Sequence, residues 1–394
     1  MKKKMAVLSA ALMIFACNAI PIMADDHASS FADLSDHWAK NSVAIAIAKK
    51  YVDGYGDGTF RPENYVSTAE FIKMVVTATK LPVTGNTEGR EWYVPYVKAA
   101  VDKGIVQEDS VNIDVLNMPI SRVEMSKIAV RATDPTLQQK YVNLNNQGAM
   151  FTAASKGLIQ GLAKGELAPD GSTTRAQSVT IIERILSLNS GEKLETDKLA
   201  ISNAELAFKR TNLFSMIPVF GGKQYDENMW NPSKLVMETP DGKYKGVIDQ
   251  IIAIDMANPN DPNWEAAGDI SNLKWWVPGT TTANSYIKDY PDSYLIVVKR
   301  HVEFSKDPNA YGDMPPFLNF YGIKSPDLSA ANKGTLNSIA EVFVIKPGDT
   351  SMYIIPKSGF KTNVSVQLDI SAPAIPPQKD YGRTIVDILA PKTN

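Results

Sequence analysis

The chain has 394 residues, a length that suggests about two or three domains. Hydrophobic residues make up 44% of the chain and charged residues 21%, which is ordinary for a globular protein. The formal net charge at pH 7 is −2, and no basic run occurs outside the N-terminus. These values argue against a protein that binds nucleic acid through a basic surface.

The N-terminus has the three parts of a secretory signal peptide. Three lysines at residues 2–4 precede an apolar core at residues 6–16, and the sequence PIMA ends at a candidate cleavage site after Ala24. This core is too short to span a membrane. Residues 14–17, IFAC, resemble a lipoprotein box, but the bulky phenylalanine makes lipidation of Cys17 the weaker alternative.

Three segments of the first half have the pattern of a helix start. Each begins with Ser or Thr at the N-cap and has Glu or Gln three residues later, which is the pattern of a capping box. The N-caps are 54 and 53 residues apart, and this even spacing predicts a repeat architecture. The segments are STAE (67–70), SRVE (121–124) and TRAQ (174–177).

The similarity between the repeats extends beyond the helix starts. YVDGYGDGTFRP (51–62) aligns without gaps on LIQGLAKGELAP (158–169), with matching glycines and a matching proline. The middle copy, residues 105–116, keeps the length but loses the glycines. We expect two helices joined by a loop in each repeat. Because one such unit cannot bury its own apolar face, we expect the three units to pack together.

An arginine follows the N-cap in two of the three copies, at Arg122 and Arg175. The first helical position lies at the positive end of the helix dipole, where a cation is unfavourable. A helix N-terminus can bind an anion, and a guanidinium beside it can hold a carboxylate through two hydrogen bonds. Both arginines are therefore candidate ligand-binding residues; the alternative is that each is a solvated surface residue.

FADLSDHWA (31–39), GYGDGTFRP (54–62) and the three capping boxes together resemble the S-layer homology (SLH) domain. The resemblance covers residues 31–188. It implies an all-α module of three repeats with pseudo-threefold symmetry. It also implies a secreted protein held without a covalent bond on the Gram-positive cell surface, with secondary cell-wall polysaccharide, often pyruvylated, as its partner.

The resemblance implies carbohydrate binding at the three helix starts, with Arg122 and Arg175 as the main candidates. Thr68 takes the arginine position of the first repeat and carries no charge, so we expect that groove to bind weakly or not at all. We expect Trp38 and Trp92 to pack in the core rather than stack on sugars. The other candidates are capping residues for which a structural role is the stronger interpretation: Ser67, Glu70, Ser121, Glu124, Thr174 and Gln177.

The second half has the pattern of β-structure. Residues 293–304 and 363–371 alternate between apolar and polar side chains, with residues 364, 366, 368 and 370 on one side. Turns at residues 240–242 and 347–349 separate such runs, and this spacing suggests a β-sandwich. Residues 341–356 are also weakly similar to bacterial immunoglobulin-like domains.

Little in the second half indicates catalysis. Its single histidine, His301, lies in a predicted strand and it has no cysteine, so we expect no zinc and no other cofactor. Acidic residues are plentiful, but no spacing identifies a catalytic pair. Of the adjacent Trp275 and Trp276, one should be buried and the other on the open side, because neighbouring strand residues face opposite sides. A sugar-binding role for either tryptophan is the weaker alternative.

We therefore predict a multidomain protein without enzymatic activity, with an all-α three-repeat module followed by a mainly-β, sandwich-like domain. The alternative is a wall-anchored hydrolase whose catalytic site lies in the C-terminal half. The predicted boundaries are a signal peptide (1–24), three repeats (25–84, 85–137 and 138–190), a linker with a short helix (191–210) and the β-domain (211–394).

Overall fold

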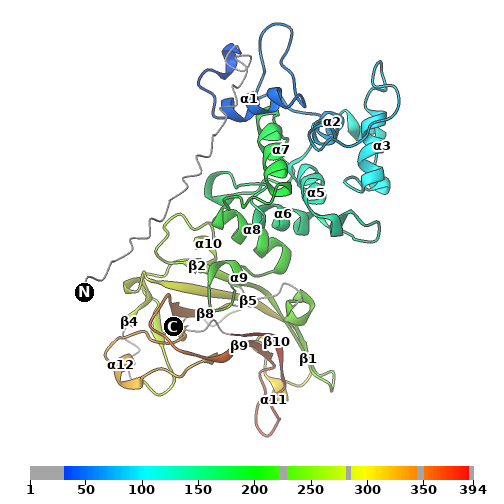
Figure 1. Ribbon diagram of the computed structural model, residues 1–394. Coiled ribbons are helices and arrows are strands. Elements are labelled where there is room, and N and C mark those ends of the chain that lie inside the picture. The colour runs from blue at the N-terminus through cyan, green and yellow to red at the C-terminus, as the bar shows by residue number, and fades with distance from the viewer. Residues whose placement is uncertain (1–30, 222–228, 281–284, 344–349, 390–394) are drawn as a thin grey trace, which may run out of the picture.

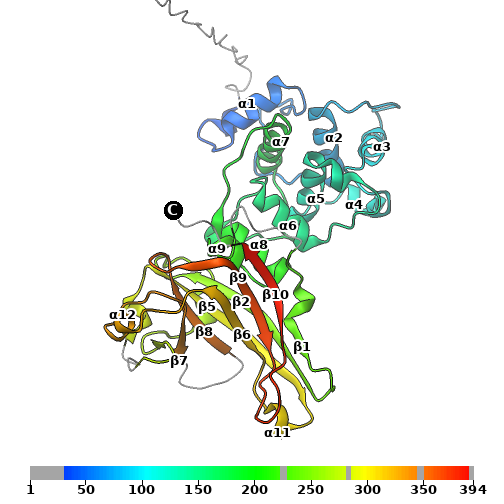
Figure 2. The same cartoon turned by 60° about the horizontal axis from the view of Figure 1, so that its bottom comes forward.

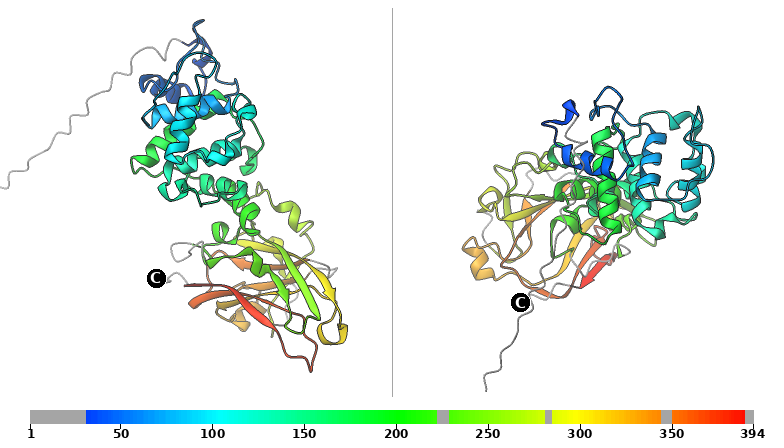
Figure 3. Two further views of the ribbon diagram at one scale, coloured as in Figure 1. Left: turned by 90° about the vertical axis from the view of Figure 1, so that its right-hand side faces the viewer. Right: turned by 45° about the horizontal axis from the view of Figure 1, so that its top comes forward.

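The computed structural model describes residues 31–221, 229–280, 285–343 and 350–389. The predicted signal peptide and Cys17 lie outside these residues. Helices form the N-terminal part of the molecule and strands the C-terminal part, at opposite ends of an elongated shape (Figures 1 and 3). This arrangement confirms a helical region followed by a β-sheet region. Among the described helices, none has the length and apolar character needed to cross a membrane.

The helical part contains the helix pairs predicted for the three repeats. In each pair, the second helix begins directly after one of the three N-caps. The pairs are α1 (Lys40–Ala48) with α2 (Thr68–Ala78), α3 (Val94–Lys103) with α5 (Arg122–Thr133), and α6 (Asn146–Ser155) with α7 (Arg175–Asn189). A short α4 (Ile113–Leu116) lies in the loop of the second repeat.

The helix starts have the predicted capping chemistry, with one exception. The side chains of Ser67 and Thr174 accept hydrogen bonds from the backbone three residues later, and the reciprocal bonds complete both capping boxes. Ser121 accepts the same bond from the Glu124 amide at 3.2 Å. The Glu124 carboxylate instead pairs with Lys127 at 2.7 Å, so the prediction of a complete box at this helix is wrong.

A closed ring of backbone hydrogen bonds joins the residues that precede the three N-caps. The Val66 amide donates to Thr173 O at 3.1 Å, the Thr173 amide to Ile120 O at 3.0 Å, and the Ile120 amide to Val66 O at 2.9 Å. All three side chains are buried. Segments more than fifty residues apart in the sequence therefore meet at one point, around which the second helices are arranged.

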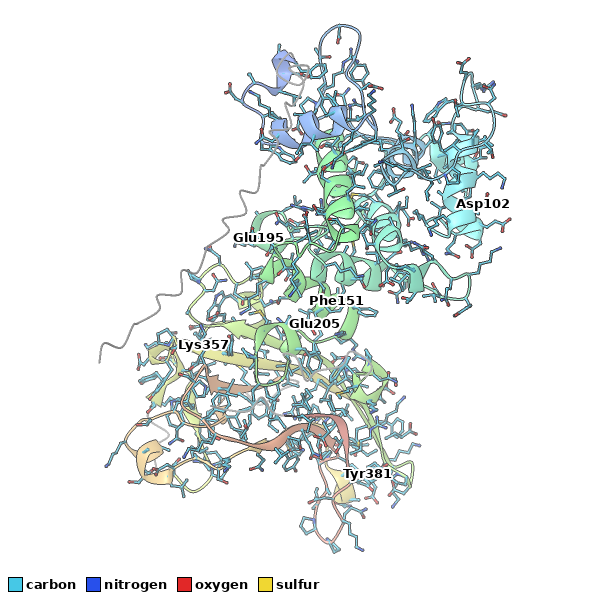
Figure 4. The ribbon with its side chains drawn as sticks, in the orientation of Figure 1. Asp102, Phe151, Glu195, Glu205, Lys357 and Tyr381 are labelled. Carbon is cyan, nitrogen blue, oxygen red and sulfur yellow. The ribbon has the colours of Figure 1, made fainter. Side chains whose placement is uncertain are left out.

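Residues 198–209 of the predicted linker form a regular helix, α8 (Lys198–Lys209), followed by α9 (Leu213–Met216). Ala200 and Ala204 of α8 belong to the apolar core of the helical part. In Figure 4, Phe151 and Glu205 lie where the helices meet the sheet region. The buried Asn212 then bonds both backbone groups of Ala253 on the first long strand, at 2.9 and 2.6 Å. The connection between the two parts is thus packed and hydrogen-bonded.

The described strands form two antiparallel sheets. The larger sheet has the order β1 (Val236–Glu238), β2 (Tyr244–Asp255), β5 (Ser293–Ser305), β8 (Thr350–Pro356), β7 (Ala340–Phe343), β3 (Lys274–Trp276) and β4 (Ser285–Tyr286). The smaller has the order β10 (Gly382–Leu389), β9 (Thr362–Ser371) and β6 (Phe317–Ile323). Short helices lie in the connecting segments: α10 (Trp264–Ala267), α11 (Pro308–Tyr311) and α12 (Leu328–Asn332).

The smaller sheet covers one face of the larger one (Figure 2). Ile248 and Ile296 of the larger sheet share a core with Leu368 and Ile388 of the smaller sheet. The opposite face of the larger sheet has a second core that includes Trp275 and Ile254. The immunoglobulin-like fold suggested by residues 341–356 stays a prediction.

Candidate functional site

Each of the three helix starts contacts the loop of the next repeat. The first backbone amide of α2, at Thr68, donates to Met118 O at 3.0 Å. The matching amide of Arg122 donates to Gly171 O at 2.8 Å. In the same way, the α7 start contacts the first repeat, and the contacts therefore run from repeat 1 to 2, from 2 to 3 and from 3 back to 1. The predicted site residues consequently lie at three junctions between repeats.

At the junction of repeats 2 and 3, the Arg122 side chain turns toward the loop of repeat 3. Its Nε donates to Leu167 O at 2.8 Å and its Nη2 to Gln160 O at 3.0 Å. The side chain is buried, and burial lowers the pKa of Arg122, with a further lowering from the nearby charge of Arg184. An arginine nevertheless keeps its proton, so the bonds to the two carbonyls are charge-assisted.

Arg175 makes the same two contacts at the junction of repeats 3 and 1. Its Nε donates to Phe60 O at 3.0 Å and its Nη2 to Asp53 O at 2.9 Å. The guanidinium also lies 4.6 Å from the centre of the Phe60 ring and 5.0 Å from that of Tyr55. A cation is unfavourable at the start of a helix, and here the carbonyls and aromatic rings of the neighbouring repeat offset this cost.

These contacts give the two arginines a structural role that the sequence did not reveal. Leu167 and Gln160 occupy the same loop positions as Phe60 and Asp53, so the arrangement is repeated rather than accidental. Arg122 is only 6% exposed, and its Nε and Nη2 already have partners. Carbohydrate binding by the two arginines stays a prediction.

The junction of repeats 1 and 2 has no such arginine, and a groove of about 850 Å³ is open there. We call it the Thr68 groove. It lies between the start of α2, the face of α5, and the loop segments 105–119 and 140–144 of the second repeat. Of the nine predicted site residues, it brings together Thr68, Ser121 and Glu124. The sequence predicted the weakest binding at this junction, but the structure has an open groove here.

The wall of the Thr68 groove combines apolar and charged side chains. Ile72, Leu116 and Ile128 supply apolar surface, and Tyr141 at its edge is largely exposed. Among the side chains that line the groove, three are basic and two are acidic; the basic ones are Lys127, Arg131 and Lys140, the acidic ones Asp109 and Glu124. Tyr141 and the basic residues were not predicted as site residues, because they belong neither to the capping boxes nor to the aligned loop segments.

Asp33, from the FADL segment, positions the loop that receives Arg175. Its carboxylate accepts hydrogen bonds from the amides of Phe60 at 3.0 Å and Arg61 at 2.7 Å. Burial acts to raise the pKa of Asp33, but these backbone hydrogen bonds outweigh it, and the net pKa lies below its ordinary value. The charged carboxylate therefore holds the loop so that the Phe60 carbonyl can accept from Arg175.

Trp38 and Trp92, both predicted to pack in the core, differ in their burial. Trp92 is partly buried and packs against Tyr93 and Tyr96, as predicted. Trp38 is 63% exposed, with its ring centre 5.3 Å from that of His37, so the prediction that it packs in the core is wrong. The reason is that α1 buries Val43 and Ala46 instead, and leaves the preceding turn at the surface.

In the sheet region, Trp275 is fully buried and Trp276 is partly exposed, which confirms the predicted alternation. Trp276 lies beside Phe343 of β7, with ring centres 5.9 Å apart. His301 is partly exposed, and its Nδ1 lies 2.8 Å from the Asp249 carboxylate on the neighbouring strand β2.

Comparison with known proteins agrees with this geometry. The sequence model of the S-layer homology domain matches residues 30–72 and 147–177. The chain is 27% identical to amylopullulanase from Thermoanaerobacterium thermosulfurigenes, over 41% of this chain and 10% of that protein. It is 27% identical to exoglucanase XynX from Acetivibrio thermocellus, over 40% of this chain and 16% of that protein. It is 31% identical to S-layer protein sap from Bacillus anthracis, over 26% of this chain and 13% of that protein.

The matched segments lie within the helical part of the molecule. Two segments of the chain thus match the S-layer homology domain, and the similarity to S-layer and other cell-surface proteins supports a secreted protein located at the cell surface. The two matched segments fall in the first and third repeats. The second repeat, whose loop lacks the glycines, is also the one that forms the floor of the Thr68 groove.

Proposed function

We propose that this protein is held without a covalent bond on secondary cell-wall polysaccharide by its helical part, and that its sheet region serves a structural or interaction role outside the wall. The observation that carries the proposal is the Thr68 groove. Its volume of about 850 Å³ is within the usual range for ligand sites. A mixture of apolar surface and a few polar groups suits a sugar, which has both C–H faces and hydroxyls.

We also propose that the helical part has pseudo-threefold symmetry, with one helix pair per repeat and one junction between each pair of neighbours. The closed ring of bonds through Val66, Ile120 and Thr173 supports it. The matching contacts of Arg122 and Arg175 support it further. On this view, the three junctions are equivalent in position but not in chemistry, since two are filled by arginines.

The proposal includes the absence of enzymatic activity. Amylopullulanase and exoglucanase XynX are named as enzymes, but the matched share of each is 10% and 16% of its length. The matched share of this chain, 41% and 40%, is close to the size of its helical part. These relatives therefore support attachment and give no support for catalysis in the sheet region. Release of reducing ends from wall polysaccharide by the purified chain would favour a hydrolase instead.

The test is co-sedimentation of the full chain with cell-wall sacculi. One preparation retains the wall polysaccharide, and the other has had it extracted chemically. We expect the chain to pellet with the first and to stay in the supernatant with the second. Equal pelleting with both preparations would show that peptidoglycan, rather than the polysaccharide, is bound, and would contradict the proposal.

A further inference from the structure

One end of the larger sheet lies beyond the smaller sheet. Side chains at the two edges of the smaller sheet fix it over the other end. Arg383 of β10 donates to Val236 O of β1. The Tyr353 hydroxyl of β8 donates to Leu318 O of β6 at 2.8 Å. The strands β7, β3 and β4 follow β8 in the order of the larger sheet. Their face on the side of the smaller sheet is therefore not covered by it.

The two faces of β3 and β7 differ in burial. Trp275 and Val342 are buried in the core on the far face of the sheet. Successive side chains of a strand point to opposite faces, so the residues beside these two lie on the uncovered face. Phe343 is 52% exposed there. We use the name β3–β7 patch for the four side chains on this face, which are Lys274, Trp276, Glu341 and Phe343.

The strand register sets the four side chains of the β3–β7 patch in a square. Lys274 lies opposite Phe343, and Trp276 lies opposite Glu341. The aromatic rings therefore occupy one diagonal, with their centres 5.9 Å apart, and the two opposite charges occupy the other. Among the described residues, neither Lys274 nor Glu341 has an ion-pair partner. The patch thus has a cation and an anion on either side of an aromatic pair.

We propose that the β3–β7 patch is the contact surface of a symmetric dimer, in which it packs face to face on the same patch of a second copy of this chain. A two-fold axis along the aromatic diagonal places Trp276 and Phe343 against their own counterparts. The same axis places each Lys274 opposite the Glu341 of the other copy, so both charges gain a partner. This inference goes beyond the proposed function and does not depend on wall binding.

A second copy fits the β3–β7 patch better than a sugar chain does. A flat platform for a sugar needs aromatic faces in one plane, but the ring planes of Trp276 and Phe343 are inclined by 44°. The neighbouring Tyr286 ring is already occupied, since Lys274 Nζ lies 4.8 Å from its centre. Aromatic rings at the centre with charges toward the rim are typical of protein interfaces. One charge of each sign also complements an identical surface, whereas a neutral sugar has no use for either.

Sedimentation equilibrium of the full chain without polysaccharide, over a range of protein concentrations, tests the dimer. We expect a monomer in equilibrium with a dimer and no larger species, because an isologous contact closes on itself. Lys274→Glu and Glu341→Lys each create two like-charge contacts in the dimer, and each should weaken it at least about tenfold. The double variant exchanges the two charges and should restore the dimer to within about threefold of the parent chain.

Two control variants make the same charge changes elsewhere on the larger sheet. Lys299→Glu and Glu238→Lys lie at exposed positions of β5 and β1, and both should dimerise as the parent chain does. Circular dichroism of every variant checks that the fold is kept. If a single reversal in the patch leaves the dimer unchanged, or if the exchanged pair does not restore it, the contact lies elsewhere and the proposal is wrong.

The position of the two-fold axis gives a second test. Phe343 should lie against Phe343 of the other copy, so Phe343→Cys, with the single native cysteine removed by Cys17→Ser, should form a disulfide-linked dimer on mild oxidation. Thr384→Cys in the same background, at an exposed position of β10, should not. A parent chain that stays monomeric at every concentration overturns the proposal. A monomer whose binding of a soluble glycan is lost in Trp276→Ala also overturns it, because the patch would then bind sugar.

Discussion

Arg122 and Arg175, 53 residues apart in the sequence, donate the same pair of hydrogen bonds to matching carbonyls of the next repeat. Each arginine is the first residue of its helix, and its guanidinium binds backbone carbonyls in a loop of the next repeat. These carbonyls lie 38 to 122 residues away along the chain. The two arginines thus connect repeat 2 to repeat 3 and repeat 3 to repeat 1. At the remaining junction, the threonine at position 68 leaves the Thr68 groove open.

Replacing either arginine should therefore cost stability. We expect Arg122→Ala to lower the free energy of unfolding by about 2–3 kcal/mol, because two charge-assisted bonds are lost and a buried space is left. Arg175→Ala should cost less, about 1–2 kcal/mol, since its side chain is only partly buried and water can replace it. Urea unfolding of the full chain, followed by circular dichroism, measures both. Unchanged stability of Arg122→Ala would contradict this role.

Local sequence patterns were sufficient to predict where the helices start. They did not predict the hydrogen-bond partners of the arginine side chains at these starts. A capping box involves residues within one turn, so Ser67 and Thr174 were correctly placed. The partners of Arg122 and Arg175 are distant carbonyls, and a backbone carbonyl has no sequence signature.

The alternating pattern of β9 was also predictable only in part. Val366, Leu368 and Ile370 are buried on one side, as predicted, whereas Val364 is 82% exposed. The pairing with β10 ends at Ser365 opposite Leu389, so Val364 lies beyond the described partner strand. Alternation in the sequence indicates which face a residue takes, but tertiary packing decides whether that face is covered.

A helix start with a complete capping box and one without should differ in how much stability they lose when the glutamate side chain three residues after the N-cap is removed. Glu70 closes its capping box by accepting from the Ser67 amide at 2.8 Å, whereas Glu124 pairs with Lys127. We expect Glu70→Ala to cost about 0.5–1 kcal/mol more stability than Glu124→Ala. Thermal unfolding of both variants at the same ionic strength checks this order. An equal loss in both would mean that the reciprocal bond adds nothing.

Asp33 predicts a pH dependence of stability with a definite sign. Its pKa in the folded protein lies below the ordinary value of 3.8, because the backbone bonds from Phe60 and Arg61 outweigh the effect of burial. The stabilisation from this group is therefore fully present above about pH 4 and is lost as the pH falls through the lower, folded-state pKa.

Unfolding of the parent chain and of Asp33→Asn between pH 6 and about pH 2 measures this contribution. The parent chain should be more stable at pH 6, and the difference should shrink as the pH falls. A difference that stays constant across this range would show that the charge of Asp33 does not matter to the loop.

The junction between the helical part and the sheets depends on Asn212. Its side chain bonds both backbone groups of Ala253 and the Ser202 hydroxyl, all of them buried. Asn212→Ala leaves these groups without partners, and we expect a loss of about 2–4 kcal/mol. It should also increase proteolytic cleavage between residues 190 and 215. Asn363→Ala, at an exposed position of β9, is the control and should change neither.

The Thr68 groove allows a test in which binding and stability change independently. Thr68→Arg introduces at the first junction the side chain that fills the other two. The second repeat lacks the glycine-containing loop that presents the receiving carbonyls, and Gln107 O, at the position of Asp53, already accepts from Ser110. The new arginine should therefore gain little stability, within about 0.5 kcal/mol of the parent chain. It should nevertheless occupy the groove, where Lys127, Arg131 and Lys140 already supply positive charge.

We expect Thr68→Arg to reduce binding to polysaccharide-bearing sacculi at least about tenfold, because the added side chain takes the space of the sugar. Thr384→Arg makes the same change in charge at an exposed position of β10 and should bind as the parent chain does. If Thr68→Arg binds normally while Arg122→Ala and Arg175→Ala do not, the ligand lies at the other two junctions. The groove would then be an empty space between repeats, and the arginines would hold both the neighbouring loops and the sugar.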